Sequence, residues 1–280
     1  MIDHRHVLGL SGGRDSAALA VYMRERYPKI QVQYFFTDTG KELPEVYEFL
    51  GKLEGFLGKE IVRLNPKRNF DFWLKQYNNF LPSPQTRWCT RQLKIKPFEE
   101  WIAPTLQACG EVTSYVAIRA DEDRAGYKPT NPGVNVRFPF VEDGLNKRDV
   151  IQLLEESGLG MPAYYRWRSR SGCTFCFYQQ KIEWVRLMEE HPKAFEAAKA
   201  YEKTALDSGS PFTWSQGESL EGLSKVERVE KIKEDYQRRK ERLLKQRRLN
   251  PLLDGLDTDE NVDELYGIDE VATSCIICHK

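Results

Sequence analysis

The sequence predicts an α/β fold: a doubly wound, mostly parallel sheet followed by a C-terminal helical appendage that contains cysteines. First, short apolar runs alternate with helical patterns through the first half of the chain, which is typical of a parallel sheet covered on both faces. Second, a glycine-rich turn over residues 11–16 separates the first strand from the first helix. Third, this alternation stops after Gly160, where aromatic, basic and long charged segments follow.

Each element is predicted from its local pattern. Residues 44–57 have helical spacing, because their apolar side chains fall on one face. Residues 112–118 are rich in β-branched side chains, as in a central strand. Beyond residue 160 we expect helical patterns over 180–202, a loop over 207–217 and a charged helix over 224–249. The sheet is expected from strands at 7–10, 32–37, 60–64, 112–118 and 134–138, with helices at 17–23, 44–57, 70–80, 97–107 and 147–157.

The charge pattern argues against one broad nucleic-acid surface. The net charge is zero, so no global field draws the chain onto nucleic acid. The charges are segregated, however: residues 224–250 hold eleven Lys and Arg against five Asp and Glu, and residues 251–280 hold eight acidic residues. This gives four expected parts: a nucleotide-binding domain over 1–160, a cysteine-rich loop with helices over 161–215, the charged helix over 216–250, and an acidic tail with a C-x-x-C over 251–280.

The sequence points to the cytoplasm. Its first residues lead directly into a strand and do not resemble a signal peptide. No apolar run is long enough to span a bilayer, so we expect no membrane association. In that compartment the six cysteines indicate metal or redox chemistry rather than structural disulfides.

The segment between the first strand and the first helix is expected to bind nucleotide phosphates. Its glycines adopt unusual backbone angles and let phosphate oxygens approach, and the helix start adds partial positive charge. The serines add hydroxyl donors, and the aspartate can cap the helix or hold magnesium. The spacing matches neither the Walker P-loop nor G-x-G-x-x-G. The predicted phosphate site consists of Ser11, Gly12, Gly13, Arg14, Asp15 and Ser16.

Two further segments lie at the carboxyl ends of predicted strands, where parallel sheets bind ligands. Asp38-Thr39-Gly40 can contact ribose or adenine, and Asp38 can bind magnesium; a plain turn is the alternative. In residues 119–124, Arg119 and Arg124 can clamp a phosphate or sulfate, while the acidic residues between them bind metal or orient the arginines. The alternative for this segment is a solvated, salt-bridged loop.

Three cysteines form the predicted metal site. Cys173 and Cys176 make a C-x-x-C before a helix, and Cys89 lies far upstream. Together they can hold three irons of a [4Fe–4S] cluster, with the fourth ligand undetermined. Half a zinc site, a redox dithiol or an inert pair are the alternatives. Aromatic residues interleave with the nearby arginines and are candidates for stacking bases: Trp88, Tyr164, Tyr165 and Trp167.

A second C-x-x-C lies at the end of the chain. Cys275 and Cys278 precede a histidine, but the context of c-type haem attachment is missing. Either cysteine could act as a sulfur carrier. The pair could instead complete a four-cysteine zinc site with Cys173 and Cys176, or belong to a spectator tail.

These segments together resemble the phosphoadenosine phosphosulfate (PAPS) reductase family of the PP-loop superfamily, over roughly residues 7–180. The likeness includes the 11–16 turn, the strand ends at 38–40 and 118–122, and the segments 89–97, 138–140 and 172–176. It implies an adenine nucleotide α-hydrolase-like, PP-loop fold. Cluster-holding reductases have an adjacent cysteine pair where this chain has Cys89-Thr90, and their C-terminal cysteine motif is only loosely similar to residues 275–278.

Among the relatives, the chain looks most like the PP-loop component of DNA phosphorothioation systems (the DndC and SspD type), which modify DNA in phage defence. The resemblance implies an ATP pyrophosphatase that forms AMP and pyrophosphate and activates a substrate for sulfur transfer. A cysteine desulfurase would donate the sulfur, and DNA would be the acceptor or a partner. The 11–16 turn would hold the leaving pyrophosphate, with Mg²⁺ on Asp15 or Asp38. Asp15, Arg119 and Arg124 are the expected catalytic residues.

Three other functions stay open. A reductase of PAPS or APS would release sulfite from a sulfonucleotide. A tRNA-thiolating enzyme would use the same ATP chemistry on another acceptor. A zinc-stabilised nucleotide-binding module would regulate a partner without catalysis. Self-association into a homo-oligomer is also left open.

Overall fold

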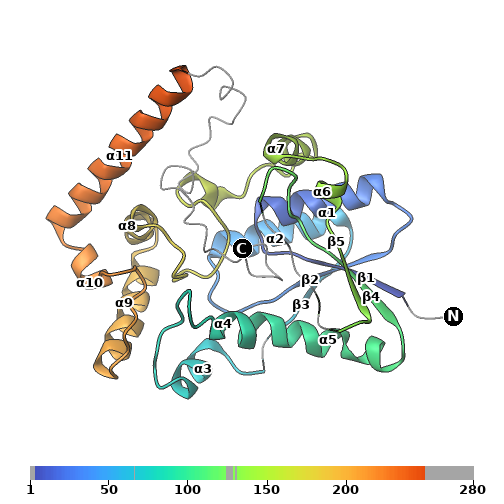
Figure 1. Ribbon diagram of the computed structural model, residues 1–280, viewed down its shortest axis with the longest axis horizontal. Helices are drawn as coiled ribbons and strands as arrows, with labels where there is room; N and C mark the ends of the chain where they lie inside the picture. The colour runs from blue at the N-terminus through green and yellow to red at the C-terminus, as the bar shows by residue number, and fades with distance from the viewer. Residues whose placement is uncertain (1–3, 66, 124–128, 130, 250–280) are drawn as a thin grey trace. The chain divides into compact units, whose positions relative to one another are not determined.

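The computed structural model describes residues 4–65, 67–123, 129 and 131–249 (Figure 1). Its contacts divide the chain into two compact units. Within the described ranges, unit 1 comprises residues 4–70 and 88–164, and unit 2 comprises residues 71–87 and 165–249. Unit 2 therefore takes a short segment from the middle of the stretch that builds unit 1.

Unit 1 contains a five-stranded sheet in the order β3-β2-β1-β4-β5. All four pairs of neighbouring strands are parallel, which confirms the predicted α/β class. β1 is central because it pairs with β2 on one side and β4 on the other. The strands span His4–Gly9 (β1), Val32–Phe36 (β2), Ile61–Arg63 (β3), Glu111–Tyr115 (β4) and Val134–Arg137 (β5).

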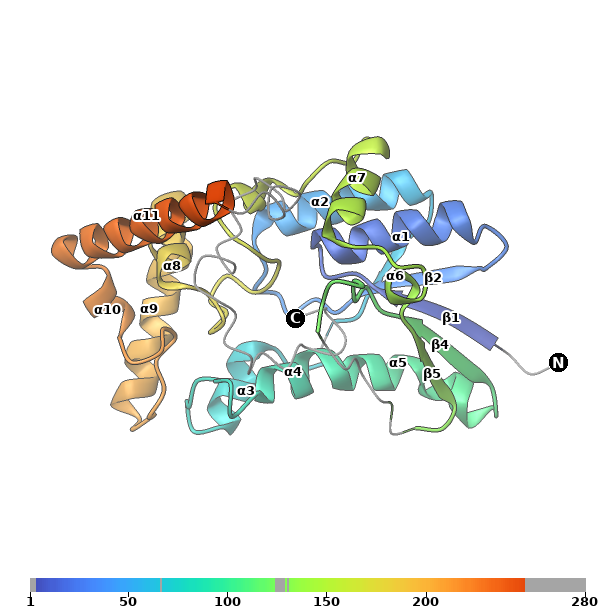
Figure 2. The same ribbon diagram turned by 45° about the horizontal axis from the view of Figure 1, so that its top comes forward.

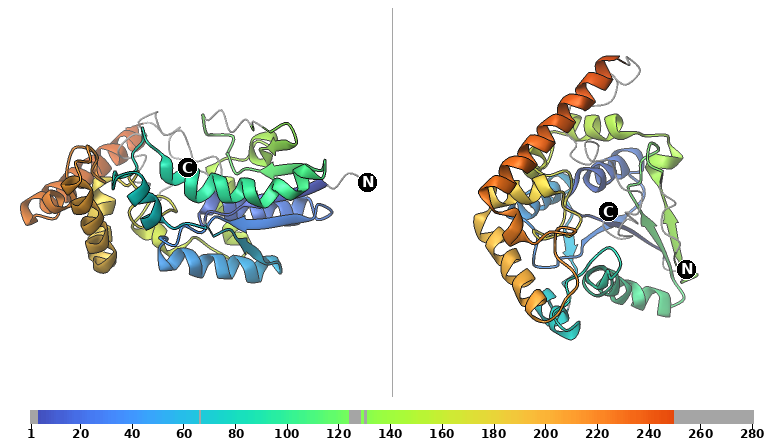
Figure 3. Two further views of the ribbon diagram at one scale, coloured as in Figure 1. Left: turned by 90° about the horizontal axis from the view of Figure 1, so that it is seen from below. Right: turned by 60° about the vertical axis from the view of Figure 1, so that its left-hand side comes forward.

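Helices cover both faces of this sheet. Figure 2 shows α1, α2 and α7 on one face and α5 on the other; the left view of Figure 3 looks onto the face that α5 covers. A short α4 and a π-helical turn lead directly into α5. The helices of unit 1 span Arg14–Arg26 (α1), Pro44–Leu57 (α2), Trp88–Thr90 (α4), Arg91–Ile95 (the π-helical turn), Lys96–Gln107 (α5), Pro139–Glu142 (α6) and Lys147–Glu156 (α7).

An apolar core lies between the sheet and α5. Phe35 of β2 stacks on Phe98 of α5, with the ring centroids 5.0 Å apart. Burying each such side chain contributes about 1.5–3 kcal/mol relative to leaving it exposed. This layer fixes the sheet against α5 and so positions the strand ends; its buried members are Val7, Phe35, Leu64, Phe98, Ile102, Val112 and Val134.

The bounds of α2 follow from its sequence. Pro44 occupies the first turn, where its missing N–H costs no helical hydrogen bond. The buried face repeats at helical spacing through Val46, Phe49 and Leu53. Gly58 ends the helix in the left-handed conformation, with φ +61°. The structure therefore confirms the predicted helix over residues 44–57.

Unit 2 is helical in its described part. The predicted run over 180–202 is divided into two helices at His191, because Pro192 begins a new helix. Glu202 is 2% exposed and accepts hydrogen bonds from the backbone N–H groups of Trp214 (2.9 Å) and Leu220 (2.5 Å). The helices, shown in the right view of Figure 3, span Phe70–Gln76 (α3, whose first residue belongs to unit 1), Ala163–Arg166 (a 3₁₀ turn across the unit boundary), Lys181–Glu190 (α8), Pro192–Asp207 (α9), Leu220–Leu223 (α10) and Val226–Leu249 (α11).

Among the described residues, no helix has both the length and the apolar character required to cross a membrane.

Candidate functional site

The strand order of unit 1 locates the candidate site. The chain passes from β1 through α1 to β2 on one side, while β4 follows α5 and pairs with β1 on the other side. The order therefore reverses between β1 and β4. In open parallel sheets, ligands bind in the crevice at the carboxyl ends of the strands at this reversal. The turn at 11–13 follows β1 and the segment at 116–122 follows β4, so two of the predicted segments lie there.

The turn after β1 requires a glycine at its second position. Gly12 has φ +71°, in the left-handed region that other residues rarely adopt. A Cβ atom at Gly12 would lie 2.6 Å from Cγ1 of Val46 on α2, so the turn also packs too closely for a side chain. The glycine predicted to allow close approach of phosphate thus also allows close approach of α2.

The two serines of the turn bond to the loop itself. Ser16 Oγ accepts a hydrogen bond from the backbone N–H of Ser11 (3.1 Å) and donates one to the carbonyl of Gly13 (3.1 Å). Ser11 Oγ accepts the N–H of Gly13 at 3.2 Å and lies 3.2 Å from Ser16 Oγ. These bonds hold the shape of the turn, and the predicted role of the two hydroxyls as donors to phosphate stays a prediction.

Helix α1 begins at this turn with no side-chain cap. Its N-cap residue is Gly13, which has no side chain to offer, and Asp15 stands in the first turn. The first N–H groups of a helix have no partner within the helix, and the helix dipole adds partial positive charge there. The start of α1 is therefore suited to an anion.

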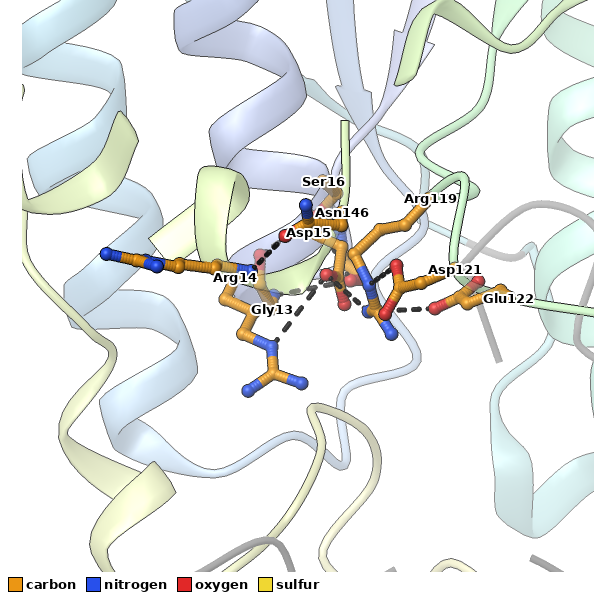
Figure 4. Close-up of polar contacts among 10 residues, drawn as sticks. Gly13, Arg14, Asp15, Ser16, Arg119, Asp121, Glu122 and Asn146 are labelled. Atoms are coloured by element: carbon orange, nitrogen blue, oxygen red, sulfur yellow. Dashed lines mark hydrogen bonds and ion pairs between the residues drawn. The ribbon is translucent and has the colours of Figure 1, made fainter. Parts of the chain in front are cut away.

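Arg119, which follows β4, forms an ion pair with Asp15 at the start of α1, which follows β1. One Nη of Arg119 lies 2.8 Å from Oδ1 of Asp15, and the same atom lies 2.8 Å from Glu122. The Arg119 Nε bonds Asp121 at 3.0 Å. Figure 4 shows the guanidinium among these three carboxylates, at the start of α1. The structure thus brings together two of the three residues predicted to be catalytic.

The environment of Arg119 keeps it charged. Its side chain is 11% exposed, and burial alone would favour the neutral form. The carboxylates of Asp15, Glu122 and Asp121 outweigh burial and raise the pKa of Arg119 above its ordinary value. Arg14 Nε also lies 3.7 Å from Oδ1 of Asp15, so three acids and two cations gather here and one negative charge is left uncompensated.

Asp38, Thr39 and Gly40 follow β2, the strand beside β1. Asp38 accepts hydrogen bonds from the Gly40 N–H and the Tyr47 hydroxyl, both at 2.8 Å. Burial first, and then the bond to Asp38, raise the pKa of Tyr47 above its ordinary value. Thr39 is buried and donates to Glu42 at 3.0 Å. The segment has the form of an Asx turn, and its predicted contact with nucleotide stays a prediction.

The cysteines predicted as cluster ligands lie in different units. Cys89 is on α4 in unit 1, while Cys173 and Cys176 are in unit 2, where the Cys176 N–H donates to the Cys173 carbonyl at 3.2 Å. All three are half-buried thiols without a disulfide. Within the described residues, no three His, Cys, Asp or Glu side chains are grouped to hold a metal ion. Because these ligands belong to different units, the predicted cluster site stays a prediction, and we derive no chemical step through a cluster.

Three of the aromatic residues expected to stack bases are buried. Trp88 is 5% exposed, Trp167 3% and Tyr164 0%. They therefore contribute to packing in this structure, and the prediction that they offer open faces to bases is wrong for them. Tyr164 has another contact that the sequence did not indicate: its hydroxyl donates to the carbonyl of Gly12 at 2.8 Å. No local sequence pattern could indicate this hydrogen bond, because the two residues are 152 positions apart.

Arg124, Cys275 and Cys278 lie outside the described residues, so their predicted roles stay predictions.

Comparison with known proteins agrees with the geometry of unit 1. Residues 5–136 match the model of the phosphoadenosine phosphosulfate reductase domain family. This segment is PAPS reductase-like. It includes the 11–16 turn, the 38–40 segment and Arg119, so all the described nucleotide-site candidates lie within the PAPS reductase-like region.

The chain is also similar to individual proteins. It is 26% identical over 201 residues to an uncharacterised protein of Methanocaldococcus jannaschii, an alignment that covers 68% of this chain and 40% of that protein. The chain thus spans less than half of that relative's length. A PAPS reductase of Candida auris, solved with phosphate, has TM-score 0.47 and 13% identity, covering 60% of this chain and 81% of its own. The tRNA thiolase NcsA of Methanococcus maripaludis, solved with its [4Fe–4S] cluster, has TM-score 0.38 and 16% identity, covering 73% and 72%.

Proposed function

We propose that this chain is an ATP pyrophosphatase that splits ATP between the α- and β-phosphates and activates an acceptor for sulfur transfer. The observation that carries the proposal is the arrangement at the strand reversal: the uncapped start of α1 faces Arg119, which is held by Asp15. A nucleotide at this crevice meets both a helix N-terminus and a buried guanidinium. The match of residues 5–136 to the PAPS reductase domain family supports an adenine-nucleotide site in this part of the chain.

The chain's own groups would act on the triphosphate in distinct ways. The first turn of α1 holds the β- and γ-phosphates through its N–H groups. Arg119 stabilises the negative charge that develops as the bond to the α-phosphorus breaks. Asp15 keeps Arg119 aimed at this position, because their 2.8 Å ion pair is the contact that joins the two strand ends.

Magnesium fits this site as part of the substrate. The excess of carboxylates around Arg119 would repel bare ATP, and a magnesium ion bound to the phosphates removes that repulsion. Mg²⁺ is commonly held by one or two carboxylates together with substrate phosphates.

The acceptor is assigned from the resemblance to the DNA phosphorothioation component of DndC type. We propose DNA as the acceptor and a cysteine desulfurase as the sulfur donor. Incubation with the desulfurase, labelled cysteine, Mg·ATP and either DNA or tRNA distinguishes the acceptors. Label that stays in DNA after deproteinisation supports phosphorothioation, whereas label in tRNA alone would reassign the acceptor to tRNA.

A sulfonucleotide reductase is the second candidate, and the matched family model favours it. The two functions give different products. Incubation with Mg·ATP yields AMP and pyrophosphate if the first proposal is right. Incubation with PAPS or APS and a thiol reductant yields sulfite if the second is right. ADP and phosphate from ATP, with no sulfite from a sulfonucleotide, would contradict both.

The variant Asp15→Asn tests the site itself. It keeps the size of the side chain and removes the charge that pairs with Arg119. We expect pyrophosphate release to fall by about 10²-fold, the loss typical of removing an electrostatic contribution at a reacting centre. Glu156→Gln, an exposed charge change on α7 in the same unit, is the matched control and should retain full activity. Equal activity of both variants would show that the chemistry occurs elsewhere.

A further inference from the structure

The peptide group between Gly12 and Gly13 is held at both of its polar atoms. Its carbonyl accepts the Tyr164 hydroxyl at 2.8 Å, and its N–H donates to Ser11 Oγ at 3.2 Å. A peptide group is planar, so its C=O and N–H turn together. The two bonds therefore fix the orientation of this one plane at the centre of the turn.

This plane needs an external support. Glycine has no Cβ, so a peptide between two glycines can rotate at little steric cost. A rotated plane would carry the Gly12 carbonyl away from Tyr164 and exchange the positions of a hydrogen-bond donor and an acceptor in the turn. Since a phosphate requires donors and is repelled by a carbonyl oxygen, the orientation of this plane matters for anion binding.

Tyr164 is suited to provide that support. The side chain is fully buried, so its hydroxyl does not exchange the Gly12 carbonyl for bulk water. It is also the last residue of unit 1, and the next residue begins unit 2. The hydroxyl therefore ties the turn after β1 to the point at which the chain leaves the nucleotide-binding unit.

We propose that Tyr164 is a positioning residue for nucleotide binding, whose hydroxyl holds the Gly12–Gly13 peptide in the orientation that accepts phosphate. This inference rests on the proposed function for its ligand, a nucleoside triphosphate with magnesium. Tyr164 does not touch the reacting atoms; it acts through the Gly12 carbonyl.

The test compares Tyr164→Phe with Tyr34→Phe in the full chain. Both variants remove only a hydroxyl from a buried tyrosine of unit 1, but Tyr34 lies on β2 and makes no hydrogen bond to the turn in the described structure. Hydrogen exchange without nucleotide is measured on the peptide that covers residues 8–17. We expect exchange there to be about fivefold faster in Tyr164→Phe, as for the loss of one hydrogen bond, with peptides from α5 and β5 unchanged.

Binding provides the second readout. The dissociation constant of the non-cleavable analogue adenosine 5′-(α,β-methylene)triphosphate with magnesium is measured by calorimetry. We expect it to rise about five- to tenfold in Tyr164→Phe and to stay unchanged in Tyr34→Phe. If the wild type turns over ATP, KM should rise by a similar factor while kcat changes by less than twofold, because the hydroxyl affects ligand binding rather than bond breaking.

The outcomes separate the two proposals. Unchanged exchange in residues 8–17, or faster exchange throughout unit 1, overturns the positioning role. Failure of the wild type to release pyrophosphate overturns the proposed function, while exchange and analogue binding still report on Tyr164. If Tyr164→Phe does not fold, hydrogen exchange of the wild type alone provides the test. A Gly13 amide that exchanges as fast as in an unstructured peptide would contradict a fixed orientation of the Gly12–Gly13 peptide.

Discussion

Replacing Gly12 with alanine tests the central turn most directly. Gly12 has φ +71°, and a Cβ built there lies 2.6 Å from Cγ1 of Val46. Two separate penalties are therefore expected. The left-handed conformation costs an L-residue about 1–2 kcal/mol, and an overpacked contact costs about 1–3 kcal/mol. Gly12→Ala should thus lower the free energy of unfolding by about 2–5 kcal/mol.

A second substitution separates the two penalties. Val46 is fully buried, so Val46→Ala removes the clashing methyl groups and costs about 2 kcal/mol by itself. In the double variant the clash is gone and only the backbone strain remains. We therefore expect the double variant to be about 1–3 kcal/mol more stable than the sum of the single effects predicts.

Equilibrium urea unfolding of the full chain, followed by circular dichroism, measures these differences. Gly51→Ala is the matched control, because Gly51 lies within α2, its φ is not positive and a Cβ there meets no atom within 4 Å. It should leave stability unchanged or raise it by up to about 1 kcal/mol. A cost below about 1 kcal/mol for Gly12→Ala, or strict additivity with Val46→Ala, would refute the described geometry of the turn.

Two further predictions concern unit 2. Glu218 bonds Arg228 and Lys181, and chiefly the Arg228 bond lowers its pKa from 4.5 to about 2. The stability that the ionised Glu218 carboxylate contributes is complete above pH 4.5 and is lost as the pH falls toward 2. Between these pH values the urea midpoint of Glu218→Gln should therefore depend less on pH than that of the wild type. An identical pH profile for the two proteins would contradict the ion pair. Glu202→Ala leaves two buried backbone N–H groups without their acceptor. The free energy of unfolding, measured with heat or urea, should fall by about 2 kcal/mol or more. A decrease within about 0.5 kcal/mol would show that water replaces the carboxylate.

The sheet and its order of elements followed from local patterns. Pro44 and Gly58 mark the two ends of α2, so its bounds could be read directly. β1 begins at His4, earlier than its apolar run, because its first residues are polar or half-exposed and carry no hydrophobic signal. The helix–π-turn–helix over residues 88–107 was predicted only from residue 97, since a π-helical turn has no sequence period of its own.

The candidate site was predictable in its residues but not in its bonds. Position after a strand was enough to select Asp15 and Arg119. Their ion pair depends on β1 and β4 being neighbours, which no local pattern states. Tyr164 was missed as a partner of Gly12 for the same reason, because only the folded chain brings residues 152 apart into contact. The sequence also did not indicate that the serine hydroxyls bond within the turn, and their contact with phosphate stays a prediction.

The pairing of β1 with β4 has a consequence for synthesis on the ribosome. While the nascent chain emerges, β1 can pair with β2 early, but its other edge stays uncovered until residues 111–115 are made. Residues 71–87, which emerge in between, belong to the other unit and must wait still longer for residues after 165. A half-made chain therefore exposes the open edge of its central strand, a template for wrong pairing. Chaperone demand during translation should accordingly peak before residue 115 has emerged.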